Sequence, residues 1–153
     1  MDNRADIEAR FFRSRNSLRL VVLLTMINVV LDTADAPLSF PFSASLPSFF
    51  VFMGQAQYES TGGFALFAMG LTAAFLVVSV YYLCFIFSKK HPSLIVAALV
   101  FFALDTLFLL GLAALGGFDY SVLIDLGFHG WVIYSLALGV KAWAEMRKTE
   151  DGK

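Results

Sequence analysis

Long apolar runs separated by short polar connections dominate the chain. A membrane-spanning helix needs about 20 mostly apolar residues. Four runs come close to or exceed that length: 17–35, 60–88, 92–115 and 120–143. The first has the shortest uninterrupted apolar stretch, and we expect Arg19 to extend its charged group to the membrane surface. The pattern therefore predicts an all-α membrane protein with four transmembrane helices, forming a single membrane domain over 1–153.

The segment 36–59, between the first two spans, follows a different pattern. Residues 36–58 carry no charge, yet Pro37, Pro41 and Pro47 interrupt them. Proline inside a helix removes a backbone hydrogen bond, so three prolines in this segment exclude a continuous helix. We expect an irregular outer segment followed by a short helix around 48–57. It either lies on the membrane surface or enters the protein, where irregular backbone is tolerated only if protein or water covers it.

Composition supports the membrane interpretation. Of 153 residues, 59% are hydrophobic and 15% are charged, whereas soluble domains average about 45–50% apolar and about 25% charged. The net charge of −1 argues against a nucleic-acid partner. A lone cysteine, Cys84, cannot form an internal disulfide.

Basic residues predict how the chain is oriented in the membrane. The 11 lysines and arginines occur before or at the start of the first span, at Lys89 and Lys90, and from Lys141 onward. The connections 32–59 and 116–119 contain none. Because basic residues favour the cytoplasmic side, we expect a cell-membrane protein with both termini in the cytoplasm, including the tail 147–153. The lipid bilayer is its first partner, and a homo-oligomer or a larger membrane partner is compatible with its size.

Ionisable side chains interrupt the predicted spans and are the best candidates for function. An aspartate at the centre of a span costs about 2.5–3.5 kcal/mol, so such residues usually face the protein interior. Under the predicted topology, several polar groups fall in the outer half of the membrane. We expect them to surround one cavity: Asn28, Asp32, Asp105, Thr106, Asp125 and His129.

Each of these residues also has a purely structural interpretation. Asp32 could simply end the first helix in water. Asp105 could be a buried hydrogen-bonded lock between helices. Asp125 lies four residues before His129, and its carboxylate could fix the tautomer of that imidazole without any chemistry.

Three functions remain open from the residues. The first is binding or transport of a cation, a proton or a small polar solute. For this function Asp105, Asp125 and His129 are possible ligands of a divalent metal, with zinc, manganese and nickel equally compatible. The second is a structural or accessory subunit of a membrane complex.

The third is an intramembrane hydrolase or transferase acting on lipid, with His129 as general base. No HExxH or GxSxG motif is present to support a catalytic role, so the sequence favours a protein that is not an enzyme.

Three segments carry a resemblance to known proteins. Residues 101–108 (FFALDTLF), 125–134 (DLGFHGWVIY) and 42–47 (FSASLP) resemble a group of small bacterial four-span integral membrane proteins with no assigned activity. The likeness covers most of the chain after Asn28. It implies a small bacterial multi-pass protein, and it provides no catalytic residue, cofactor or substrate.

Overall fold

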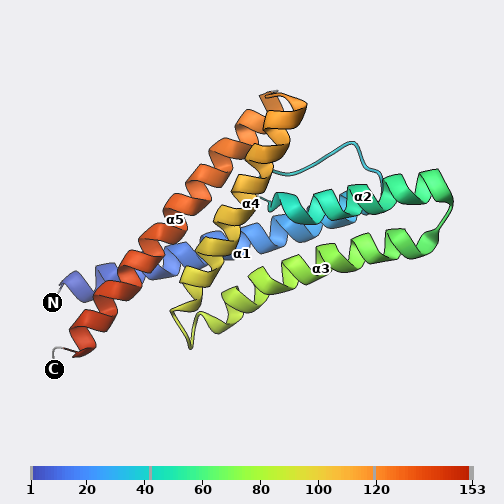
Figure 1. The fold of residues 1–153 in the computed structure, drawn as a ribbon. Helices are drawn as coiled ribbons and strands as arrows, with labels where there is room; N and C mark the ends of the chain where they lie inside the picture. Colours follow the sequence, from blue (N-terminus) through green and yellow to red (C-terminus); the bar gives the residue numbers. More distant parts are fainter. Residues whose placement is uncertain (1, 42, 119, 152–153) are drawn as a thin grey trace.

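A computed structural model describes residues 2–41, 43–118 and 120–151. Phe42 and the last two residues of the predicted tail therefore lie outside the described part. Five helices account for most of it (Figure 1): α1 (Asp2–Thr33), α2 (Ser45–Thr61), α3 (Phe64–Phe87), α4 (Leu94–Gly116) and α5 (Tyr120–Asp151). No strand occurs among these residues.

All of these helices except α2 are long and apolar enough to cross a membrane. The prediction of an all-α, multi-pass membrane protein with four spanning helices is confirmed at this level. The helices at the two ends of the chain extend further than the predicted spans. The N-terminal turns of α1 are charged, and Arg4 and Glu8 form an exposed i,i+4 ion pair of 3.0 Å there.

The helices form two arms that diverge from a shared base (Figure 1). One arm consists of α2, α3 and the second half of α1, and the other consists of α4 and α5. Helix α1 belongs to the first arm at its C-terminal end and packs on α5 near its N-terminal end. At the base lie both chain termini and the α3–α4 turn.

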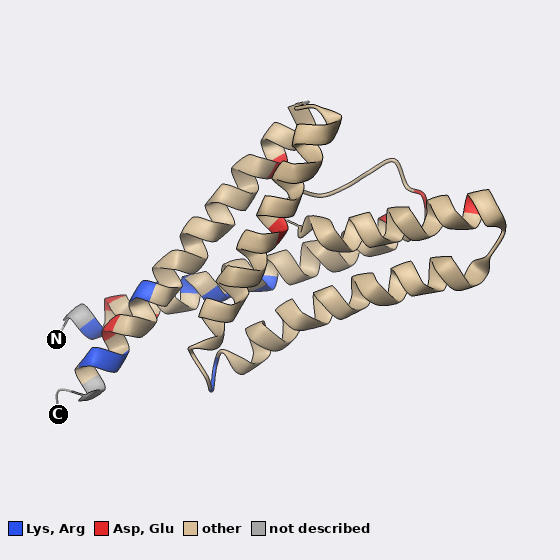
Figure 2. Ribbon diagram, in the orientation of Figure 1, with Lys and Arg blue, Asp and Glu red and all other residues tan. Residues whose placement is uncertain are grey.

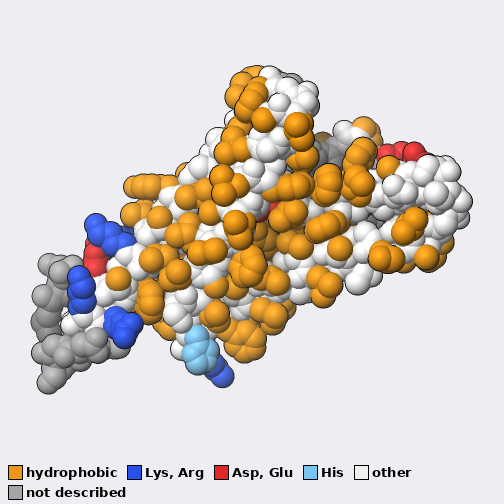
Figure 3. All heavy atoms as spheres, in the orientation of Figure 1, with side chains coloured by type: hydrophobic (Ala, Val, Ile, Leu, Met, Phe, Trp, Pro, Cys, Tyr) orange, Lys and Arg blue, Asp and Glu red, His pale blue; other side chains and the backbone are white. Residues whose placement is uncertain are grey.

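Basic and apolar side chains are concentrated in different parts of the molecule. Lysines and arginines lie toward the base, in the first half of α1, at the end of α5 and at the α3–α4 turn (Figure 2). Hydrophobic side chains cover the middle of the visible face (Figure 3). One end of the molecule is thus basic, as charge counting along the sequence suggests. The side of the membrane to which this end belongs stays a prediction.

The segment between α1 and α2 turns back into the protein. Helix α1 ends in a Schellman motif, with Asp35 in the left-handed conformation (φ 52°) and the Ala36 N–H donating to the carbonyl of Leu31 at 2.9 Å. From there the described residues of the irregular segment, 36–41 and 43–44, return to the junction of the two arms (Figure 1). Helix α2 begins beside Asp105, at the midpoint of α4, and runs outward again.

Two glycines let α2 and α3 approach closely. A Cβ on Gly70 would lie 2.5 Å from the Phe50 carbonyl oxygen, and a Cβ on Gly54 would lie 3.2 Å from that of Phe67. Backbone therefore packs on backbone at this crossing, as small residues allow between membrane helices. This contact holds α2 in a hairpin with α3.

Candidate functional site

Asp105 caps the first turn of α2 from a different helix. Its Oδ2 accepts a hydrogen bond from the Ser45 N–H at 2.8 Å, and its Oδ1 accepts one from the Leu46 N–H, also at 2.8 Å. Ala44, at the N-cap position, has no side-chain oxygen with which to do this. The first N–H groups of a helix lack intrahelical partners and carry partial positive charge, which a carboxylate complements. Asp105 is fully buried, so it locks α2 to α4.

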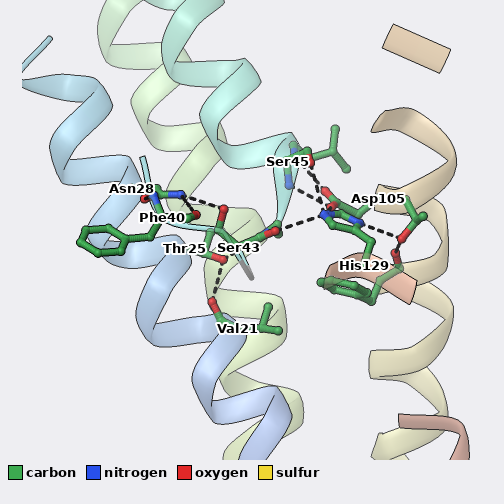
Figure 4. Close-up of polar contacts among 12 residues, drawn as sticks. Val21, Thr25, Asn28, Phe40, Ser43, Ser45, Asp105 and His129 are labelled. Carbon is green, nitrogen blue, oxygen red and sulfur yellow. Dashed lines mark hydrogen bonds and ion pairs between the residues drawn. The ribbon is translucent and has the colours of Figure 1, made fainter. Parts of the chain in front are cut away.

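His129 lies beside this lock and is equally buried, at 1% exposure. Its Nδ1 is 2.8 Å from the Thr106 hydroxyl, while its Nε2 is 3.2 Å from the Ser43 carbonyl oxygen and 3.9 Å from the Asp105 carboxylate. The ring packs on Phe102 with 4.8 Å between centroids. Groups from α4, α5 and the irregular segment therefore meet around one imidazole (Figure 4).

The hydrogen-bond donors around His129 permit two protonation states. The Thr106 hydroxyl has one hydrogen and lies 2.8 Å from both the Phe102 carbonyl and His129 Nδ1. When Thr106 donates to Phe102, Nδ1 and Nε2 both donate, and the imidazolium is balanced by the Asp105 carboxylate. When Thr106 donates to Nδ1, the ring is neutral. The two states therefore differ in the acceptor of the Thr106 hydrogen, which is the Phe102 carbonyl in one and His129 Nδ1 in the other.

Two polar residues of α1 hold the irregular segment in place. The Asn28 side-chain amide donates to the Phe40 carbonyl at 2.7 Å and accepts from the Phe40 N–H at 2.8 Å. It also donates to the Ser43 hydroxyl at 2.8 Å. The Thr25 hydroxyl accepts from the Ala44 N–H at 2.9 Å. Backbone groups of Phe40 and Ala44 that no helix satisfies are therefore paired with side chains of α1 (Figure 4).

Between the two arms lies a crevice with a volume of about 590 Å³. Three carboxylates line it, and no lysine or arginine occurs among its described lining residues. Every element except α3 contributes to the lining: Asn28, Asp32, Asp35, Ala36, Ser39, Phe40, Ser43, Ser45, Ser48, Phe49, Phe52, Gln55, Leu109, Leu112 and Asp125.

Asp32 is a crevice carboxylate whose hydrogen bonding is incomplete among the described residues. Its Oδ2 is buried and has no hydrogen-bond partner among the described residues. Its backbone carbonyl accepts from the Gln55 side chain at 2.7 Å, which ties α2 to α1 at this point. A buried acceptor without a donor is costly, so this oxygen is where a cationic or hydrogen-bonding solute would be favoured.

The six residues predicted from sequence to surround one cavity divide into two connected groups. Asp105, Thr106 and His129 form the buried cluster, and Asn28, Asp32 and Asp125 line the crevice. The hydrogen bonds of Asn28 and Thr106 described above are made to protein groups, so they are not available to a solute.

The predicted metal site is not assembled in this way. Within the described ranges, no group of three His, Cys, Asp or Glu side chains is arranged to hold a metal ion. Asp105, Asp125 and His129 therefore do not form such a group, because Asp105 turns its two oxygens to the start of α2.

Ser43 and Ser45 connect the two groups, and sequence reasoning missed both. They line the crevice and also contact His129, with Ser45 Oγ at 3.5 Å from Nε2. The available signal was an uncharged, serine-rich segment that proline keeps from being helical. The arrangement differs from a hydrolase triad, in which the acid holds the imidazole nitrogen opposite the nucleophile. Here Asp105 and Ser45 approach the same nitrogen.

Fold and site together define a multi-pass α-helical membrane protein with an acidic crevice above a buried Asp–His pair. No protein-family model, curated protein or solved structure matches the chain. The resemblance to small bacterial four-span proteins therefore stays an expectation from the sequence.

Proposed function

We propose that this protein binds a small organic cation in the crevice between its two arms. The carboxylates of Asp32, Asp35 and Asp125 in the crevice, without a lysine or arginine beside them in the described lining, carry the proposal. Partly enclosed acidic walls concentrate cations because low-dielectric surroundings focus the field. One oxygen of Asp32, Oδ2, has no hydrogen-bond partner among the described residues, so protein donors do not fully use the charge of this carboxylate.

The size and lining of the crevice favour an organic cation over a single ion. A volume of about 590 Å³ is within the range of about 300–1,000 Å³ typical of small-molecule sites. Phe40, Phe49 and Phe52 line the same space as the carboxylates. Aromatic faces beside carboxylates suit an ammonium group, and each such contact contributes about 0.5–2 kcal/mol.

In a cell-membrane protein, the end of the molecule that is rich in lysine and arginine would face the cytoplasm. The crevice would then open to the outside. Ser43 and Ser45 close its floor above His129. Transport would require this floor to move, and the Asp105–His129 pair beneath it is suited to exchanging a proton as it does so. Binding from the outside is thus the first step, and proton-linked passage is the reaction class that the site favours.

The test is equilibrium binding of radiolabelled tetramethylammonium to the purified protein in lipid nanodiscs. We expect saturable binding that weakens as salt screens the carboxylates. Asp32→Asn should lower the affinity by at least about tenfold, since two opposite unit charges about 4 Å apart near a protein surface attract by up to about 4 kcal/mol and 1.4 kcal/mol is tenfold. Asp125→Asn should act in the same direction.

Glu59→Gln is the matched control. Glu59 is an exposed acid near the end of α2 that does not line the crevice, so its loss should leave binding unchanged. Equal binding by wild type, Asp32→Asn and Asp125→Asn would contradict the proposal, as would the absence of saturable binding in wild type.

A structural role is favoured by one observation and forms the second candidate. Asp105, the most deeply placed carboxylate, spends both oxygens on the start of α2. The buried cluster of Asp105, Thr106 and His129 can therefore hold α2 against α4 without any solute, as in an accessory subunit. Binding by the isolated protein would argue for the cation site, and binding that appears only with a co-purified membrane partner would argue for the accessory role.

A further inference from the structure

A second cavity, with a volume of about 320 Å³, lies between α1 and α5. Its lining residues on α1, 10–17, are nearer the N-terminal, basic end of that helix than Asn28, the first α1 residue of the acidic crevice. Its lining combines arginines, serines and aromatic residues: Arg10, Arg13, Ser14, Ser17, Trp131, Tyr134, Ser135 and Leu138.

Contacts between neighbouring residues show where this cavity lies along α1 and α5. The hydroxyls of Ser17 and Ser135 join α1 to α5 at 2.7 Å. One turn nearer the termini, Ser14 packs directly on Gly139, and a Cβ on Gly139 would also meet Ile95. Ile95 is in the first turn of α4, where a spanning helix begins. The cavity is thus at the boundary between the apolar part of the molecule and its basic end.

Ser14 carries a deeply buried hydroxyl. It is 1% exposed, and its Oγ has no hydrogen-bond partner among the described residues. Other hydroxyls on the spanning helices donate to the carbonyl four residues earlier, including those of Thr25, Thr72, Ser79 and Thr106. An unsatisfied polar group is costly in apolar surroundings, so this hydroxyl is suited to an acceptor supplied by a ligand.

Arg13 supplies the positive charge of the cavity. Arg10 is paired with Glu145 at 2.7 Å and with Asp6 at 3.4 Å, so its charge is balanced within the protein. Arg13 is exposed, and no carboxylate pairs with it in the part of the chain that the structure describes. A guanidinium group beside a hydroxyl donor is suited to a phosphate, whose oxygens accept from both.

We propose that this cavity binds the phosphate group of an anionic phospholipid from the leaflet at the basic end. Arg13 and Ser14 hold the phosphate, and the acyl chains lie along Trp131 and Leu138. A lipid fits better than free phosphate because Trp131 is 46% exposed on α5, a helix long and apolar enough to cross a membrane, where an acyl chain would cover it. This site does not depend on the cation-binding proposal.

The experiment uses Trp131 as a reporter. The chain has two tryptophans, so Trp143→Phe leaves Trp131 alone. This variant is reconstituted into phosphatidylcholine vesicles that contain either brominated phosphatidylglycerol or brominated phosphatidylcholine. We expect stronger fluorescence quenching by the anionic lipid. Arg13→Ala should lower the relative affinity for it by about tenfold, the equivalent of about 1.4 kcal/mol, because it removes a charge-assisted hydrogen bond to the phosphate.

Ser14→Ala removes only the hydroxyl, so it tests the site with little risk to folding, and it should also weaken the preference. Arg19→Ala removes the same charge from the same helix outside the cavity, and should behave as wild type. Equal quenching by the two lipids would overturn the proposal. So would an equal loss in Arg13→Ala and Arg19→Ala, because that indicates general surface charge. Displacement of the lipid by excess inorganic phosphate would overturn the assignment to a lipid.

Discussion

Replacing Asp105 by asparagine tests whether this residue is a structural lock. The two side chains have nearly the same shape, but the amide has one acceptor oxygen where the carboxylate has two. The N–H groups of Ser45 and Leu46 each use one carboxylate oxygen at 2.8 Å. The variant therefore leaves one buried N–H without a partner and removes the negative charge from the start of α2.

The expected decrease in the free energy of unfolding follows from these two losses. A hydrogen bond to a charged group contributes about 1.5–3 kcal/mol, and an anion at a partly buried helix N-terminus contributes up to about 2 kcal/mol. Because the two effects overlap, we expect the free energy of unfolding to fall by about 2–4 kcal/mol. Asp35→Asn is the control: it removes the same charge, and asparagine also tolerates the left-handed backbone of Asp35.

The assay combines reversible unfolding in mixed micelles with hydrogen exchange of the α2 amides. Asp105→Asn should unfold at lower denaturant and lose protection at the start of α2, while Asp35→Asn should match wild type. A change in unfolding free energy below about 0.5 kcal/mol, the usual range for surface substitutions, would refute the lock. Lost tetramethylammonium binding with unchanged stability would instead identify Asp105 as a direct ligand.

Two further pairs of substitutions test the packing and the hydrogen bonds that shape the crevice. Gly70→Ala should destabilise the protein by about 1–3 kcal/mol in the same unfolding assay, because its Cβ would meet backbone at 2.5 Å. Gly111→Ala, with open space around it, should be neutral or slightly stabilising, and an equal effect of both would disprove the close-packing argument. Asn28→Ala should release the irregular segment and speed its proteolysis, whereas Asn16→Ala on the exposed face of α1 should not. Equal cleavage rates in these two variants would show that the Asn28 contacts do not hold the segment.

Hydropathy alone was enough to predict the class of protein and its spanning helices. Apolar runs of membrane length must be helical because no other open structure satisfies its own backbone in lipid. The same reasoning predicts that Asp105 and His129 face inward, since exposing either to lipid is costly. The structure places both in the interior, 3.9 Å apart.

The partners of those residues were decided only by tertiary structure. Proline spacing shows that the segment after α1 is irregular, but not that it returns to the midpoint of α4. That path depends on close contact at Gly54 and Gly70 and on the capping of α2 by Asp105, which are interactions between residues far apart in the chain. Sequence periodicity reports which face of a helix is polar, and it contains no information about which other helix that face will meet.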